Sequence, residues 1–363
     1  MKILLIKELS SLHRNLKIGL QRLGHEVMLA ADGDGWKKIG GADIPLLQAG
    51  GKNLGNRIIY DYQLLKNTNS LSDFDVVQLV ESLVFPALLN GTIVHTLKNN
   101  NGILSLVSAG GDRANIDAYL SGVFEYYAWD FYKEYIKKFD KKSILGRIRR
   151  KGATDCEKFA DIIIPIMYEY SIGYENEEIY RKKLTEVIPF GLDFEELNYT
   201  ENVIKNGKVV FFHGINNEPK KGTPFIREAL VKLKENYPND VEIIIEGKMP
   251  YNEYIDVMKR ANVVIDQCCC HGYGINGGIA MAQGKIMMAG VTAKSLEALK
   301  VDSSPIIMIR PNVTQIYNQL EILLEERQNI TQRGYDSRCY VEKNHDCVNI
   351  AARYIEHWSK IRK

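Results

Sequence analysis

Residues 261–290 read ANVVIDQCCCHGYGINGGIAMAQGKIMMAG, and this stretch decides the fold class of the chain. It begins with a short apolar run from Asn262 to Gln267, rich in β-branched residues, which is typical of a buried parallel strand. A glycine loop follows, then a short helix predicted from Ile279 to Gln283. Ile286 to Ala289 forms the next strand. The order strand, loop, helix, strand predicts an α/β fold with parallel sheets.

The glycine loop is the first candidate binding site. Four glycines fall within seven residues: Gly272, Gly274, Gly277 and Gly278. Such a loop leaves backbone N–H groups uncovered, and a helix N-terminus carries roughly half a positive charge. The stretch therefore predicts a phosphate site. The alternative is a tight turn that only packs the helix against the sheet.

A second informative stretch runs from Phe211 to Thr223, FFHGINNEPKKGT. A strand ends, a glycine turn follows, and Lys221 stands just before the next helix. Ligands of open α/β sheets bind beyond the carboxyl ends of the strands, so this lysine could reach the same phosphate as the glycine loop. A solvated surface lysine is the alternative. Lys220, His213 or Asn216 could supply a further donor.

The order of motifs resembles that of GT-B glycosyltransferases, family 4 in particular, over nearly the whole chain. The similar segments are Gly272-Tyr273-Gly274, Ala280-Met281-Ala282, Lys221-Gly222, the turn VIPFGLDF at 187–194 and the opening unit with GHEV at 24–27. Both acidic residues of the family's donor-binding segment are replaced, by His271 and Ile279. Ile215 stands at the family's arginine position. Three alternatives follow: ribose recognition is absent, it comes from Glu246 or Glu297, or the donor differs.

The resemblance implies two Rossmann-like domains that face each other across a cleft. Residues 1–190 would form the acceptor domain, residues 191–345 the donor domain, and residues 346–363 a helix that crosses back. It implies a hexosyltransferase that moves a sugar from a nucleotide-sugar to a glycan or lipid-linked acceptor, with retention and without a metal or other cofactor. The alternative is a non-catalytic GT-B-like binding or scaffolding protein.

Residues expected to bind the donor lie in three loops of the second domain. They are His213, Gly214, Asn216, Lys220, Lys221, Glu246, Lys248, Met249, Gly272, Tyr273, Gly274, Ile275, Asn276, Gly277 and Gly278. The catalytic candidates are Asp112, His13 and His271. Asp112 follows a first-domain strand and two glycines, so it could bond sugar hydroxyls or take the acceptor proton. Its alternative role is an N-cap of the following helix.

Three adjacent cysteines, Cys268 to Cys270, suit reduced thiols, and on a strand they would point to alternate faces and could not share one metal ion. The net charge of +2 gives no field that points to nucleic acid. Residues 133–151 carry nine basic and two acidic side chains, a local charge of +7. This segment is either a solvated face or a contact with an anionic membrane.

No signal peptide or membrane span is recognisable, because Lys7 and Glu8 interrupt the first apolar run and no run approaches about 18 apolar residues. The expected location is the cytoplasm, with peripheral attachment to the inner face of the membrane.

Overall fold

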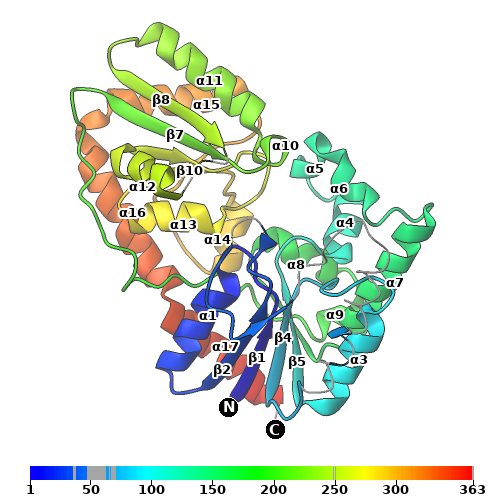
Figure 1. Cartoon of the computed structure of the whole chain (residues 1–363). Helices are drawn as coiled ribbons and strands as arrows, with labels where there is room; N and C mark the ends of the chain where they lie inside the picture. The colour runs from blue at the N-terminus through cyan, green and yellow to red at the C-terminus, as the bar shows by residue number, and fades with distance from the viewer. Residues whose placement is uncertain are drawn as a thin grey trace. The chain divides into compact units, whose positions relative to one another are not determined.

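A computed structural model describes residues 1–35, 38–46, 63, 64, 66, 71–247, 249 and 251–361 (Figure 1). Between residues 47 and 70, only residues 63, 64 and 66 are described, and they are helical. Lys248 lies outside the described residues. No helix among the described residues is long and apolar enough to cross a bilayer.

The chain divides into two compact units. Unit 1 holds residues 1–123, 134–193 and 347–363, and unit 2 holds residues 124–133 and 194–346. The chain therefore passes between the units four times. The expected boundaries were 190/191 and 345/346, and residues 124–133 were expected in the first domain. Their place in unit 2 follows from aromatic contacts described below.

Unit 1 is built on a six-stranded sheet in the order β3-β2-β1-β4-β5-β6, with all strands parallel. The bounds are β1 Lys2–Ile6, β2 Glu26–Ala31, β3 Ile44–Pro45, β4 Val76–Val80, β5 Ile103–Ser108 and β6 Ile162–Pro165. Nearly continuous Val, Ile and Leu make the central strands buried on both faces, as parallel sheets require. All carboxyl ends therefore meet at one edge of the sheet.

Helices cover both faces of this sheet (Figure 1). The helices α1 and α17 pack together, as do α3 and α7, and α4 with α8. The bounds are α1 Leu12–Arg22, α3 Asn90–Asn100, α4 Arg113–Leu120, α6 Lys133–Lys137, α7 Ile144–Phe159, α8 Tyr168–Glu175, α9 Glu178–Arg181 and α17 Cys347–Ile361. The last helix thus belongs to unit 1 although it follows unit 2 in sequence.

Unit 2 has a five-stranded parallel sheet in the order β11-β10-β9-β7-β8. Its strands are β7 Val209–Ile215, β8 Val241–Gly247, β9 Val263–Ile265, β10 Ile286–Ala289 and β11 Ile307–Met308. Its helices are α5 Ala128–Phe131, α10 Glu218–Lys221, α11 Thr223–Asn236, α12 Tyr251–Arg260, α13 Ile275–Ala282, α14 Ala293–Leu299, α15 Val313–Glu325, η2 Arg327–Asn329 and α16 Ile330–His345.

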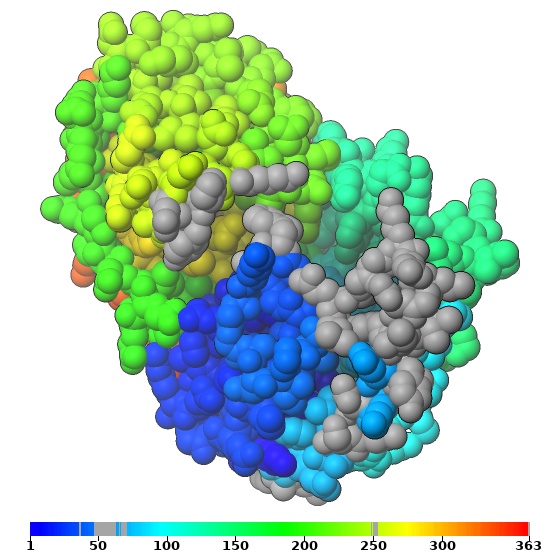
Figure 2. Space-filling view, in the orientation of Figure 1, coloured from blue at the N-terminus to red at the C-terminus, as the bar shows by residue number. Residues whose placement is uncertain are grey.

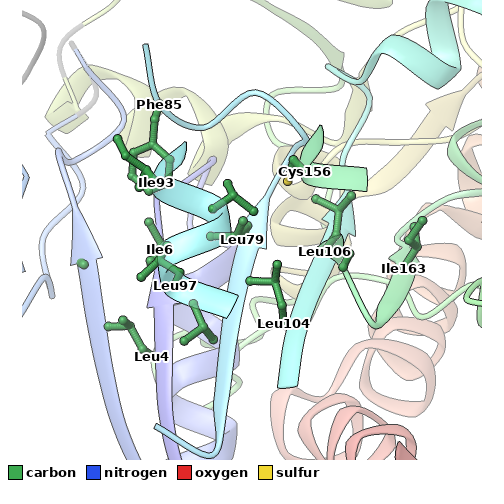
Figure 3. Close-up of a cluster of buried hydrophobic side chains, with 14 of the residues drawn as sticks. Leu4, Ile6, Leu79, Phe85, Ile93, Leu97, Leu104, Leu106, Cys156 and Ile163 are labelled. Carbon is green, nitrogen blue, oxygen red and sulfur yellow. The ribbon is translucent and has the colours of Figure 1, made fainter. Parts of the chain in front are cut away.

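The core of unit 1 explains why its strands are rich in apolar residues (Figure 3). Leu4 and Ile6 of β1, Leu79 of β4, and Leu104 and Leu106 of β5 pack in one buried cluster. They stand two residues apart along each strand, so they share one face of the sheet. On that face they meet α3 and α7 through a second set of buried side chains: Ile93, Leu97 and Cys156.

Two local predictions were wrong. The helix after the glycine loop begins at Ile275, four residues before the predicted start, because Gly277 and Gly278 lie inside the helix. The three cysteines lie in a bend after β9, which ends at Ile265. The helix α16 was not predicted; nearly half of its residues are charged or amide side chains, which hides its apolar face.

The contact of α1 with α17 generates the first prediction. A Cβ at Gly19 would lie 2.0 Å from the carbonyl oxygen of Cys347, a backbone atom that cannot turn aside. Gly19→Ala should lower the free energy of unfolding by about 1–3 kcal/mol in urea titrations, despite the better helix propensity of alanine. Gly40→Ala is the matched control, since nothing lies within 4 Å of its Cβ position. Equal stability of the two variants would contradict this packing.

Candidate functional site

The glycine loop of unit 2 is organised around the carboxylate of Asp266, the first residue after β9. Its Oδ2 accepts a hydrogen bond of 2.8 Å from the Gly274 N–H, at the N-cap of α13. An acidic side chain at a helix N-terminus interacts favourably with the helix dipole. Gly274 has φ −84°, and Gly277 is helical without a positive φ, so neither glycine is required here by backbone conformation.

Lys221 binds the other oxygen of the same carboxylate. Its Nζ lies 2.7 Å from Asp266 Oδ1, and the two side chains are only 8% and 4% exposed. Burial acts to raise the pKa of Asp266, but the Lys221 ammonium and the Gly274 N–H outweigh it, and the net pKa is lowered. The charge of the predicted phosphate-binding lysine is thus balanced inside the protein.

His213 is a buried structural link and offers no N–H to a ligand. Its Nδ1 lies 2.8 Å from the carbonyl oxygen of Ile265, which can only accept, so Nδ1 carries the hydrogen. Its Nε2 then accepts from the Thr223 hydroxyl at 2.9 Å. Burial, with the nearby charge of Lys221, lowers the pKa of His213 to about 4.

The other residues predicted to bind the donor differ in their exposure to solvent. Asn216, Lys220, Glu246 and Asn276 are exposed, and Gly214, Met249 and Gly274 are partly exposed. Gly272, Tyr273, Ile275, Gly277 and Gly278 are buried. The exposed polar groups lie at the carboxyl ends of β7 and β8 and in the first turn of α13, which is the edge where ligands of parallel sheets bind.

The side chain of Tyr273 attaches the glycine loop to α16. Its hydroxyl lies 2.6 Å from His345 Nε2 and 3.2 Å from the Tyr340 hydroxyl, both on α16. The side chain is 3% exposed, so it points into unit 2. The aromatic residue of the glycine loop therefore fixes the loop to a helix that was not predicted from the sequence.

His271 lies in an aromatic stack with residues from the first half of the chain. Its ring is nearly parallel to those of Phe124, Tyr126 and Tyr127, with centroids 5.2, 5.0 and 6.2 Å away. Its Nε2 bonds the Tyr126 carbonyl oxygen at 3.0 Å. Burial lowers the pKa of His271. These contacts explain why residues 124–133 belong to unit 2.

Two of the three adjacent cysteines have their sulfur atoms close together in the bend after β9. Cys268 and Cys269 place their sulfur atoms 3.9 Å apart, and a Cβ at Gly222 would meet both of them. The expected alternation on a strand is therefore replaced by a shared contact with Gly222, whose φ is +74°. Within the described residues, no group of three or more His, Cys, Asp or Glu is placed to hold a metal ion.

The two catalytic candidates of unit 1 are fully buried. Asp112 stands at the N-cap position of α4 without capping it; its Oδ1 accepts from the Ser82 N–H and its Oδ2 from the Ser108 hydroxyl at 2.7 Å. His13 Nδ1 bonds the Lys7 carbonyl oxygen at 2.7 Å, and its Nε2 lies 3.1 Å from the Gln78 amide nitrogen. Both side chains hold strand ends in place.

No family model matches the chain, and no curated protein matches it. Solved structures do. Sucrose-phosphate synthase from Thermosynechococcus elongatus is 13% identical with a TM-score of 0.65 over 99% of both chains. Anabaena Alr3699/HepE in complex with UDP-glucose is 12% identical with a TM-score of 0.66, over 99% of this chain and 100% of that one.

A UDP-GlcNAc 2-epimerase from Neisseria meningitidis bound to UDP-GlcNAc is also 12% identical, with a TM-score of 0.56 over 99% and 100% of the two chains. The match to glycosyltransferase structures over the whole length, together with the two parallel sheets, confirms the predicted GT-B fold. At these identities the likeness concerns the fold.

The buried pair of Lys221 and Asp266 generates a prediction on stability. Removing one partner leaves the other charge buried and uncompensated, so Lys221→Met alone should cost about 3–5 kcal/mol. Lys221→Met with Asp266→Asn should cost clearly less than the sum of the two single substitutions. A double-mutant cycle in urea measures this coupling. Additive costs would show that the pair contributes nothing as a pair.

Two buried neutral histidines predict a dependence of stability on pH. Burial lowers the pKa of His13, and of His213, from 6.5 to about 4. The unfolded chain then binds more protons, so stability is complete above pH 6.5 and falls as pH decreases toward 4. Between pH 7 and pH 5 each histidine should account for a loss of roughly 2 kcal/mol.

The variant His13→Gln/His213→Gln tests this assignment. It should be less stable than the parent at pH 7 in urea titrations, yet lose less stability between pH 7 and pH 5. Parallel pH profiles for parent and variant would contradict it.

Proposed function

We propose that the protein is a glycosyltransferase that moves a sugar from a nucleotide-sugar donor to a glycan or lipid-linked acceptor. The observation that carries the proposal is the likeness over the full chain to GT-B structures, among them Alr3699/HepE in complex with UDP and with UDP-glucose. The order of motifs in the sequence supports the same activity, with the donor in unit 2.

In unit 2, exposed residues around the Asp266 centre would meet the donor diphosphate. Lys220 and Asn216 follow β7, and Asn276 lies in the first turn of α13. Lys221 can still contribute, because an ammonium has three N–H donors and Asp266 Oδ1 takes one of them. Leaving-group charge would be met by fixed dipoles and cations, which supports the proposed metal-independent transfer. Retention follows from the resemblance to family 4.

The second candidate is a GT-B-like protein that binds a nucleotide-sugar without transferring the sugar. The observation that favours it is the Asp266 carboxylate, which already occupies Lys221 and the Gly274 N–H. Binding without release of the nucleoside diphosphate would select this candidate.

Donor binding is tested by a thermal-shift screen of the full chain with UDP-, GDP-, dTDP- and CMP-sugars. A ligand at 100 times its Kd adds about 2.7 kcal/mol of stability, which should raise Tm by several degrees. We expect a UDP-sugar to give the largest shift. If no nucleotide-sugar shifts Tm, both candidates fall.

Lys220→Ala should weaken binding of the best donor about 10- to 150-fold, because a charge-assisted hydrogen bond to phosphate is worth roughly 1.5–3 kcal/mol. Lys232→Ala is the control, since Lys232 is exposed and pairs with Glu228 within α11. Calorimetry gives both affinities. Equal affinities of the two variants would remove Lys220 from the site.

We propose also that the protein works in the cytoplasm at the inner face of the membrane. In the basic segment, Lys141, Lys142 and Arg147 are exposed beside Ile144 and Leu145, which are 71% and 50% exposed. Figure 2 shows the blue-green turn before α7 projecting from the surface. Arg150, by contrast, is bound to Asp117 and is part of the fold. Exposed apolar side chains among cations suit an anionic lipid surface.

Vesicle sedimentation tests this attachment with phosphatidylcholine vesicles that contain phosphatidylglycerol. Lys141→Gln/Lys142→Gln/Arg147→Gln should reduce binding at least tenfold, since each basic group near the surface adds about 1 kcal/mol. The control Lys232→Gln/Lys259→Gln/Lys360→Gln makes the same change in net charge elsewhere. If both triple variants bind as the parent does, or the parent does not bind, the segment is a solvated face.

A further inference from the structure

Two neighbouring strands of unit 1 end on residues in the left-handed conformation. Lys7 follows β1 with φ 72°, and Glu81 follows β4 with φ 66°. Such a conformation is costly for residues other than glycine and tends to persist where surrounding structure enforces it for function. Here the Lys7 N–H bonds the Ala30 carbonyl and the Glu81 N–H bonds the Val107 carbonyl, so the ladder extends through both.

The two side chains form an ion pair at the carboxyl edge of the sheet. Lys7 Nζ donates to Glu81 Oε2 at 2.8 Å, and the side chains are 28% and 13% exposed. The pair is thus ordered but still reachable from solvent. Burial acts to lower the pKa of Lys7, and the Glu81 carboxylate acts to raise it. The net pKa is raised, so the lysine is charged.

Buried side chains form hydrogen bonds with the backbone at and beside Lys7 and Glu81 and so hold this ion pair in position. The Lys7 carbonyl accepts the His13 Nδ1–H, His13 Nε2 accepts from the Gln78 amide, and Gln78 Oε1 accepts from the Ser105 hydroxyl. Asp112 holds the Ser82 N–H, next to Glu81. Two of the three residues predicted to be catalytic, His13 and Asp112, therefore hold the backbone beside Lys7 and Glu81 in place.

The loop after β5 is shaped around the Glu81 carboxylate. A Cβ at Gly111 would lie 1.9 Å from Glu81 Oε1, and Gly110 has φ 101° with its Cβ position against the Tyr170 ring. Two successive glycines thus let the backbone pass beside the carboxylate. The Glu81 carboxylate also interacts with the ammonium group of Lys138. Burial lowers the pKa of Lys138, and the charge of Glu81 makes the largest contribution in the opposite direction.

We infer that Lys7 and Glu81 bind hydroxyl groups of the acceptor sugar. A carboxylate accepts hydrogen bonds and an ammonium donates them, so the pair matches neighbouring sugar hydroxyls, which do both. His13 and Asp112 are positioning residues in this assignment. The inference rests on the proposed function, since it gives the acceptor side of the same reaction.

Saturation-transfer NMR with the full chain tests the pair directly. The probes are methyl glycosides of glucose, galactose, mannose and N-acetylglucosamine, each titrated with UDP present. At least one should bind the parent, and Glu81→Gln and Lys7→Met should each raise its Kd at least tenfold. Lys17→Met is the matched control, because Lys17 forms an ion pair of 2.6 Å with Asp43 in the same unit.

Three further results keep the inference separate from the proposed function. Affinity for the best nucleotide-sugar should stay within twofold in Glu81→Gln, and Lys7→Arg should recover part of the glycoside binding that Lys7→Met loses. If no methyl glycoside binds the parent, or if Glu81→Gln lowers Tm while glycoside affinity is unchanged, the pair is structural and the inference is wrong. If no nucleotide-sugar binds the parent, the proposed function fails, and this inference with it.

Discussion

The carboxylate of Asp266 is the interaction on which the glycine loop depends. It joins three segments of unit 2: the end of β9, the N-cap of α13 and Lys221 before α11. The pair with Lys221 is almost fully buried, and the lowered pKa of Asp266 keeps the carboxylate charged at neutral pH. A ligand at this edge meets a loop already held in place, with a net charge near zero at its centre.

This arrangement changes how a diphosphate would be recognised. Lys221 no longer offers a free positive charge, and His213 has both ring nitrogens engaged. Net positive charge would then come from exposed groups such as Lys220, while Lys221 and the first turn of α13 would contribute their remaining N–H groups as donors. The charged contacts of the proposed donor site would therefore be made by residues that are more exposed than those the motif indicated.

Much of the architecture could be predicted from the sequence, because buried parallel strands are short, apolar runs. The strand Ile286–Ala289, for example, was predicted with the bounds that the structure shows. The side-chain contacts that shape the glycine loop of unit 2 could not be predicted from the sequence. Lys221 meets Asp266 across 45 residues, and His271 meets Tyr126 across 145. No local spacing encodes such contacts, which arise only when strand ends meet at one edge.

The same limit explains why His13 and Asp112 looked like catalytic residues. Their residue types and loop positions fit the chemistry, but burial is a property of the folded unit, and both are fully buried. Lys7 and Glu81 were overlooked because their only signal is the end of an apolar run. A search for charged residues directly after predicted parallel strands would have found both. It would have missed Asp266, which lies inside the run predicted as a strand, because β9 ends at Ile265.

Hydrogen–deuterium exchange with and without UDP-glucose tests whether the Asp266-centred loop is a nucleotide-sugar site. We expect slower exchange in peptides that cover residues 216–222 and 266–283, with little change in the α1–α17 contact. Unchanged exchange in both peptides at a saturating concentration of the ligand, or protection confined to unit 1, would contradict it.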